Sequence, residues 1–133
     1  MKITRASDYA IRLLSHLAAG EIQTTSEELS GELGIPLNHL AKLVQVLGRR
    51  GFLLTRKGRG GGLRLGIDPK KVNVAQVIEA IEGPIVISEC ILNRKACNFS
   101  NKCKARKCLG ALKQKMFNLL SGTSIADLAL QYN

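Results

Sequence analysis

Four cysteines lie close together in the second half of this 133-residue chain. They are Cys90, Cys97, Cys103 and Cys108, and no two of them form the Cys-x-x-Cys pair that most structural zinc sites use. Wider spacing suits thiolate ligands around a group larger than one zinc ion, so an iron–sulfur cluster is the first expectation. On spacing alone, zinc binding and metal-free redox thiols remain open alternatives.

The residues around these cysteines are strongly basic. Residues 94–115 contain eight Lys and Arg and no acid, and these cations would offset the negative charge of a thiolate-bound cluster. A second basic block, residues 49–71, contains eight basic residues and one acid. The whole chain carries a net charge of +10, which predicts a polyanionic partner.

The elements before the cysteines begin with three short predicted helices. Ser7 can cap the first, which Gly20 would end. A capping box from Thr25 to Glu28 starts the second. Pro36 opens the third, whose apolar positions are Leu37, Leu40, Leu43, Val44 and Leu47.

A hairpin follows the third predicted helix. Residues 52–55 and 63–65 have strand-like patterns and flank a glycine-rich basic tip. Three helices and a two-stranded wing predict a mainly α, winged helix-turn-helix fold that binds double-stranded DNA. Candidate DNA contacts are the outward-facing residues of the third helix and the residues of the wing: Asn38, His39, Lys42, Gln45, Arg49, Arg56, Lys57, Arg59 and Gly60.

An enzyme is not expected. The glycine run lacks the Gly-x-x-x-x-Gly-Lys-Ser/Thr pattern of a phosphate-binding loop. The chain holds only two histidines, and no nucleophile, base and orienting group can be assembled from the sequence. We therefore expect no catalytic residues and no small-molecule substrate.

The rest of the sequence predicts a short fourth helix that ends near Gly83, then a cysteine-bearing loop and a helix that mediates dimerisation. In the last helix, Ala105, Leu109, Leu112, Met116 and Leu119 follow the a/d spacing of a coiled coil. Two heptads are too short to fold alone, so we expect a homodimer that presents two recognition helices to half-sites about 34 Å apart. The predicted units are a DNA-binding domain (1–84), a cluster loop (85–104) and a dimerisation helix with a C-terminal segment (105–133).

No apolar run is long enough to cross a membrane, and the first thirty residues do not resemble a signal peptide. We therefore expect a cytoplasmic protein with no membrane partner, in which a reducing environment disfavours structural disulfides.

Several motifs together resemble the Rrf2 family of bacterial winged-helix transcriptional regulators. They are the opening residues 1–12, the start of the third helix (35–44), the wing (57–65), Ile-Glu-Gly83, three spaced cysteines and the closing Thr123-Ser-Ile-Ala-Asp-Leu128. Residues Asn38-His39-x-x-Lys42 are closer to the nitric-oxide-sensing branch. The resemblance implies a repressor that senses nitric oxide, redox state or iron–sulfur status through a 2Fe-2S or 4Fe-4S cluster.

The resemblance also implies cluster ligands, namely Cys90, Cys97 and Cys103. One branch of the family places a histidine three residues after the third cysteine, but here that residue is Arg106, which cannot bind iron. The fourth ligand is then either Asp8 from the partner subunit or Cys108. A metal-free disulfide switch and a zinc-stabilised DNA-binding protein remain the alternative functions. Our hypothesis is that ligation orders the loop and sets the spacing of the recognition helices.

Overall fold

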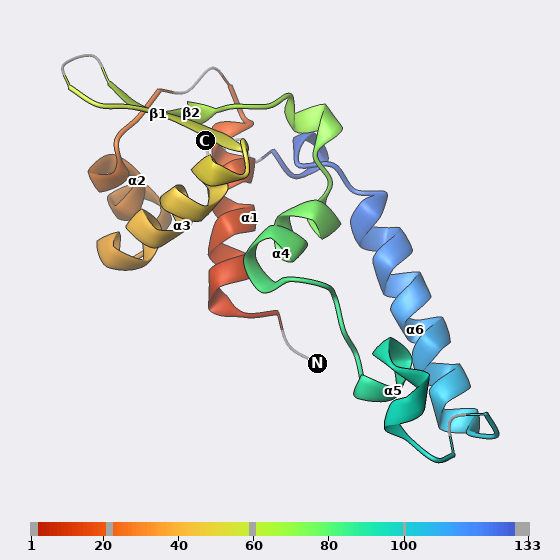
Figure 1. Cartoon of the computed structure of the whole chain (residues 1–133). Helices are drawn as coiled ribbons and strands as arrows, with labels where there is room; N and C mark the ends of the chain where they lie inside the picture. Colours follow the sequence, from red (N-terminus) through yellow and green to blue (C-terminus); the bar gives the residue numbers. More distant parts are fainter. Residues whose placement is uncertain (1–2, 21–22, 59–60, 100, 130–133) are drawn as a thin grey trace.

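The computed structural model describes residues 3–20, 23–58, 61–99 and 101–129. Three helices, α1 (Arg5–Leu17), α2 (Ser26–Leu33) and α3 (Leu37–Arg49), are followed by the strands β1 (Leu53–Arg56) and β2 (Gly62–Leu65). The strands pair antiparallel and extend away from the helices as a wing (Figure 1). The mainly α winged helix-turn-helix fold is therefore confirmed.

The start of α1 differs from the sequence expectation. Thr4, not Ser7, caps the helix, because Thr4 has an extended backbone and its hydroxyl accepts a hydrogen bond from the Ser7 amide at 3.3 Å. The Ser7 side chain is fully buried and instead donates to Glu82 at 2.7 Å. The helix ends at Leu17 rather than at Gly20.

The turn between α2 and α3 forms largely as the sequence predicts. The capping box of Thr25 and Glu28 is present, and Gly34 ends α2 with a left-handed φ of 64°. Pro36 is the N-cap of α3 rather than its first residue. Leu37 is 44% exposed, so the buried face of α3 is made of Leu40, Leu43 and Leu47.

A third segment joins the base of the wing. Thr24 pairs with Leu63 through two backbone hydrogen bonds, Leu63 N to Thr24 O at 2.6 Å and Thr24 N to Leu63 O at 3.2 Å. The Thr24 hydroxyl donates to Glu28 at 2.7 Å, and this bond is the main cause of a lowered pKa at Glu28. The wing is thereby tied to the first turn of α2.

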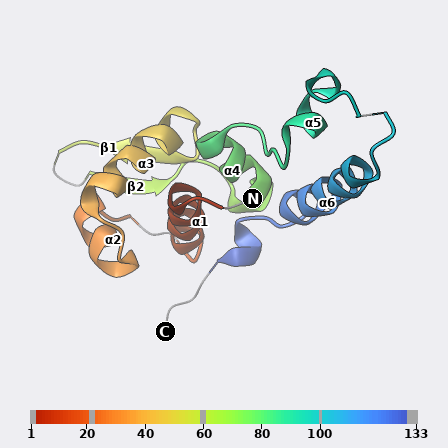
Figure 2. The ribbon, with the colours of Figure 1, turned by 90° about the horizontal axis from the view of Figure 1, so that it is seen from below.

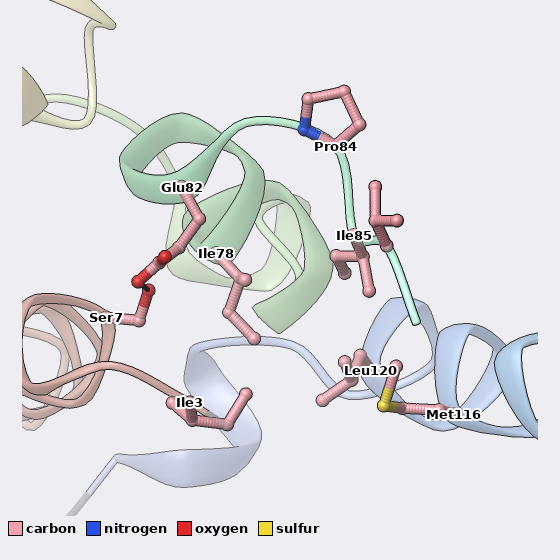
Figure 3. Close-up of a pocket in the computed structure, with 9 residues that line it drawn as sticks. Ile3, Ser7, Ile78, Glu82, Pro84, Ile85, Met116 and Leu120 are labelled. Atoms are coloured by element: carbon pink, nitrogen blue, oxygen red, sulfur yellow. Dashed lines mark hydrogen bonds between the residues drawn. The ribbon is translucent and has the colours of Figure 1, made fainter. Parts of the chain in front are cut away.

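The rest of the chain carries the cysteines and a long helix. It comprises η1 (Pro69–Lys71), α4 (Val74–Glu82), α5 (Glu89–Leu92), η2 (Arg94–Ala96), α6 (Lys104–Ser121) and η3 (Ala126–Leu128). Ile78 of α4, Ile85 of the connecting segment and Met116 and Leu120 of α6 line a cavity of about 170 Å³ where α6 meets α4 and α1 (Figure 3). Figure 2 shows α6 extending from this junction, away from the wing.

The segment after α6 returns to the winged part of the molecule. Ile125 is 1% exposed and belongs to the same core as the helices α1 to α4. Its amide donates to the Val72 carbonyl at 2.8 Å, and the Val74 amide donates to the Thr123 carbonyl at 2.9 Å. The C-terminal end of α6 is therefore attached to the winged part, although the proposed unit boundaries at 84 and 104 stay a prediction. Within the described ranges, no helix is both long and apolar enough to span a membrane.

Candidate DNA interface and candidate metal centre

The polar face of α3 is free for contact with DNA. Asn38, His39, Lys42, Gln45 and Arg49 are all exposed, whereas the opposite face of the helix is buried in the core. Amphipathic packing fixes this orientation, because Leu40, Leu43 and Leu47 can reach the core only if the polar residues point outward. Their exposure matches the sequence expectation, and their contact with DNA stays a prediction.

The wing adds basic side chains beside this face. Arg56 ends β1, and both Arg56 and Lys57 are exposed. Gly58 has a φ of 92°, a backbone conformation that glycine adopts readily at a turn. Two further predicted DNA contacts, Arg59 and Gly60, lie outside the described residues.

A chain of contacts that the sequence analysis missed links α1 to the helix-turn-helix. The Tyr9 and His39 rings lie 6.3 Å apart between centroids, and the Arg12 guanidinium lies 5.6 Å from the centre of the Tyr9 ring. Arg12 also pairs with Asp8 at 2.9 Å and donates to the Leu33 carbonyl, at the end of α2, at 3.2 Å. The helical i, i+3 and i, i+4 spacings of these residues were the available sequence signal.

The four cysteines are distributed over three local structures. Cys90 lies on the one-turn helix α5, Cys97 follows η2, and Cys103 is the N-cap of α6, on which Cys108 also lies. The Cys103 sulfur accepts a hydrogen bond from the Arg106 amide at 3.4 Å. The Ser88 hydroxyl lies 3.1 Å from the Cys90 sulfur. All four thiols are free; Cys108 is exposed and the other three are half-buried.

Cys108 lies on the side of α6 away from α5. Residues 106 and 110 of α6 contact α5, the first through a hydrogen bond to Cys90 and the second through its proximity to Ile91. Cys108 is two residues from each of them, and therefore about 200° around the helix. The structure thus places Cys90 and Cys103 near the same end of α6, with Cys108 directed elsewhere.

The donors fit an iron–sulfur cluster by their chemistry. Thiolates are the usual ligands of such clusters, and the three candidate thiols lie in one basic, partly exposed segment. In the part of the chain that the structure describes, no three His, Cys, Asp or Glu side chains already converge as a metal site. Binding would therefore require the cysteine segment, residues 88–103, to close around the cluster.

The cysteine segment and the wing lie at opposite ends of the molecule, as Figures 1 and 2 both show. A group bound at the cysteines would therefore lie far from the wing of its own subunit. Any influence on DNA binding must therefore pass through α6, through the core or through a second subunit.

Comparisons with known proteins agree with this architecture. The Rrf2 family, described as an iron-dependent transcriptional regulator, matches residues 3–131. The chain belongs to the Rrf2 family. It is therefore a DNA-binding transcriptional regulator of a family that is not enzymatic.

Individual relatives and structures give the same result. The chain is 34% identical over 132 residues to the HTH-type transcriptional regulator NsrR of Bacillus subtilis, covering 96% of this chain and 90% of that protein. It is 31% identical to NsrR of Shouchella clausii, covering 98% and 89%. The structure of CymR, the global cysteine regulator of B. subtilis, aligns with a TM-score of 0.79 at 22% identity, covering 97% and 96% of the two chains. IscR of T. potens aligns with a TM-score of 0.76 at 19% identity, covering 96% and 85%. These two structures support the fold.

Proposed function

We propose that this Rrf2-family regulator is a cytoplasmic repressor whose affinity for DNA is controlled by an iron–sulfur cluster on Cys90, Cys97 and Cys103. The observation that carries the proposal is the position of the cysteine segment, which lies between the winged part and α6 and is attached to the first turn of α6. A change in this segment is thereby transmitted to the helix that we expect to join two subunits. The NsrR relatives support nitric oxide as the signal, because the sequence resembles the nitric-oxide-sensing branch.

The chain supplies the thiolates and the charge that such a cluster requires. Cys103 lies at the N-terminus of α6, where its sulfur accepts a hydrogen bond from the Arg106 amide. Lysines and arginines in the same segment reduce the cost of gathering several thiolates. When bound, the cluster supplies iron that reacts with nitric oxide or with oxidants.

Asp8 of the partner subunit is the better candidate for the fourth ligand. Cys108 lies on the side of α6 opposite α5, which carries Cys90, so a single subunit cannot readily direct both thiols to one site. Asp8, in contrast, is an exposed carboxylate on the first turn of α1. A carboxylate from a second subunit would make cluster binding depend on how the two subunits are arranged.

The contacts of Arg12 suggest how ligation reaches the DNA-binding helix. Arg12 pairs with Asp8 and also holds the carbonyl of Leu33, directly before the turn into α3. An exposed pair of this kind contributes only about 0–1 kcal/mol, so withdrawing Asp8 costs little. Withdrawal would leave Arg12 free to shift against Tyr9, whose ring also contacts His39 of α3.

A homodimer is supported by the outer face of α6. Leu112 is 41% exposed and Leu119 is 69% exposed, and they lie on the same face as Cys108. Leu109 and Met116, the other long side chains of the predicted seam, are already half-buried against their own subunit. The exposed leucines of the a/d seam, Leu112 and Leu119, match what a second α6 would cover.

The proposal is tested by purifying the protein without oxygen and measuring visible absorption, iron and acid-labile sulfide. Coloured protein with iron and sulfide in equal amounts is expected, and nitric oxide should change both its spectrum and its affinity for DNA. Colourless protein with one zinc per chain would contradict the proposal. A metal-free protein whose DNA affinity responds only to thiol reductants would support the disulfide switch instead.

The fourth ligand is tested with Asp8→Asn and the matched control Arg12→Gln. Both variants break the Asp8–Arg12 pair, but only the first removes a carboxylate ligand. We expect Asp8→Asn to lose its cluster to a chelator at least tenfold faster than Arg12→Gln, because loss of a ligand or its immediate support costs about 10–100-fold in affinity. Equal rates in the two variants would exclude Asp8, and selective loss in Cys108→Ala would identify Cys108 instead.

A further inference from the structure

The side chain of Arg106 holds the backbone of one candidate thiolate ligand against the helix that begins at another. Its Nε donates to the carbonyl of Cys90 at 3.0 Å. Its backbone amide donates to the sulfur of Cys103 at 3.4 Å. The side chain is half-buried, whereas the neighbouring Lys104 and Lys107 are exposed. Arg106 therefore makes a directed contact that distinguishes it from the other cations of the segment.

A second contact holds α5 against α6 one turn further along. A side chain at Gly110 would come within 3.7 Å of the Cδ1 atom of Ile91. This is an ordinary van der Waals distance, so Ile91 packs directly against α6 at this position. Arg106 and Gly110 are four residues apart on one face of α6, so a hydrogen bond and an apolar contact together fix the one-turn helix α5.

A four-residue helix cannot hold its own position. Isolated helices shorter than about 12 residues are marginally stable in water, because forming the first turn fixes several backbone dihedral angles in exchange for a single hydrogen bond. The orientation of α5, and with it the position of Cys90, must therefore come from its attachment to α6. Cys97 lies further along the segment, where it follows η2.

We propose that Arg106 is a positioning residue whose side chain holds Cys90 at the end of α6 that Cys103 caps, so that these two ligands form the preformed half of the thiolate site, which Cys97 completes. The proposal rests on the proposed function, because it assigns these thiols to a cluster. In another branch of the family this position holds a histidine ligand, whereas here Arg106 would orient a ligand instead of being one.

The proposal separates the hydrogen bond of Arg106 from its charge. Arg106→Ala removes both, whereas the control Lys107→Ala removes one positive charge from the same helical turn. The first measurement is hydrogen–deuterium exchange of the amides of residues 89–93 in protein without cluster. We expect exchange about tenfold faster in Arg106→Ala than in Lys107→Ala, the size of effect expected for one hydrogen bond to a charged group. Arg106→Lys retains a donor and should restore part of the protection.

The second measurement uses loaded protein and follows visible circular dichroism and the rate of cluster loss to a chelator. Arg106→Ala should change the dichroism spectrum and lose its cluster about tenfold faster than Lys107→Ala, while both variants unfold at similar urea concentrations. Equal exchange and equal cluster loss in these two variants would overturn the role of Arg106 and leave the proposed function intact. Failure of the wild-type protein to take up any cluster would overturn both.

Discussion

Gly62 allows the base of the wing to approach the segment before α2. A Cβ atom at this position would lie 2.5 Å from the carbonyl oxygen of Thr24, closer than real contacts allow. That carbonyl accepts the 2.6 Å hydrogen bond from Leu63, so neither strand can retreat without losing the bond. The glycines of the wing therefore have different roles: Gly58 permits the turn, and Gly62 permits the close packing of two backbones.

We predict that Gly62→Ala lowers the free energy of unfolding by about 1–3 kcal/mol, the usual cost of forcing extra volume into a packed site. Urea denaturation followed by circular dichroism measures the change. Gly48→Ala is the control, because nothing lies within 4 Å of a Cβ at this position in α3. It should raise stability by about 0.5–1 kcal/mol, since alanine is the better helix former. A neutral result at Gly62 would show that Thr24 can move aside.

Sequence patterns identified single residues only where a local rule decides the outcome. The capping box of Thr25 and Glu28 and the left-handed Gly34 were predictable, because both depend on neighbours within four residues. The buried role of Ser7 was not, since its partner Glu82 is 75 residues away. The contact from Arg12 to Leu33 was missed for the same reason.

Among the elements, α3 and the wing are expected to contribute differently to DNA binding. Gln45 lies on the exposed face of α3, where an amide can read a base edge, whereas Arg56 ends β1, where a cation can reach the backbone of DNA. Phosphate contacts release counterions and base contacts do not. The two kinds of contact can therefore be separated by salt.

We predict that Arg56→Ala reduces the slope of log affinity against log salt concentration by about 1, and weakens binding to all duplexes alike. Gln45→Ala should leave the slope unchanged and cost about 1–3 kcal/mol of preference at one base pair. Fluorescence anisotropy over a range of KCl concentrations measures both quantities. Lys102→Ala removes an equivalent charge from the cysteine segment and should leave the salt slope unchanged. If Lys102→Ala reduced the slope as much as Arg56→Ala, both basic blocks of the sequence would contact DNA.

The order of the helices and strands was predictable, because each has its own hydrophobic periodicity or ends at a glycine or proline. The way in which α6 packs against the rest of the subunit was not predictable. The a/d pattern indicated one continuous seam, yet the structure divides it: Leu109 and Met116 partly face their own subunit, and Leu112 and Leu119 face outward. Periodicity indicates which residues share a face and not which partner covers it. The cysteine spacing likewise predicted ligands but not the attachment of α5 through Arg106.

For the whole molecule, the exposed leucines of α6 predict dimerisation. We expect Leu119→Glu to make the protein largely monomeric. A two-fold interface contains the residue twice, so the substitution should weaken the free energy of association by about 3 kcal/mol or more. The dissociation constant of the dimer should then rise roughly a hundredfold. Sedimentation velocity measures the association state. Gln114→Glu places the same charge at an exposed position on the other side of α6 and should leave the dimer intact. If both variants remain dimeric, α6 is not the interface.

The chain returns to the core of the winged part at Ile125, after the cysteine segment and α6. The cysteine segment and α6 form an insertion, because the polypeptide both leaves and re-enters the winged core. A backbone cut between Cys97 and Cys103 would consequently produce two fragments that stay together as one fold, with α6 held by its C-terminal end. Removing the last residues from Ser124 onward would instead take a buried side chain from the DNA-binding core itself.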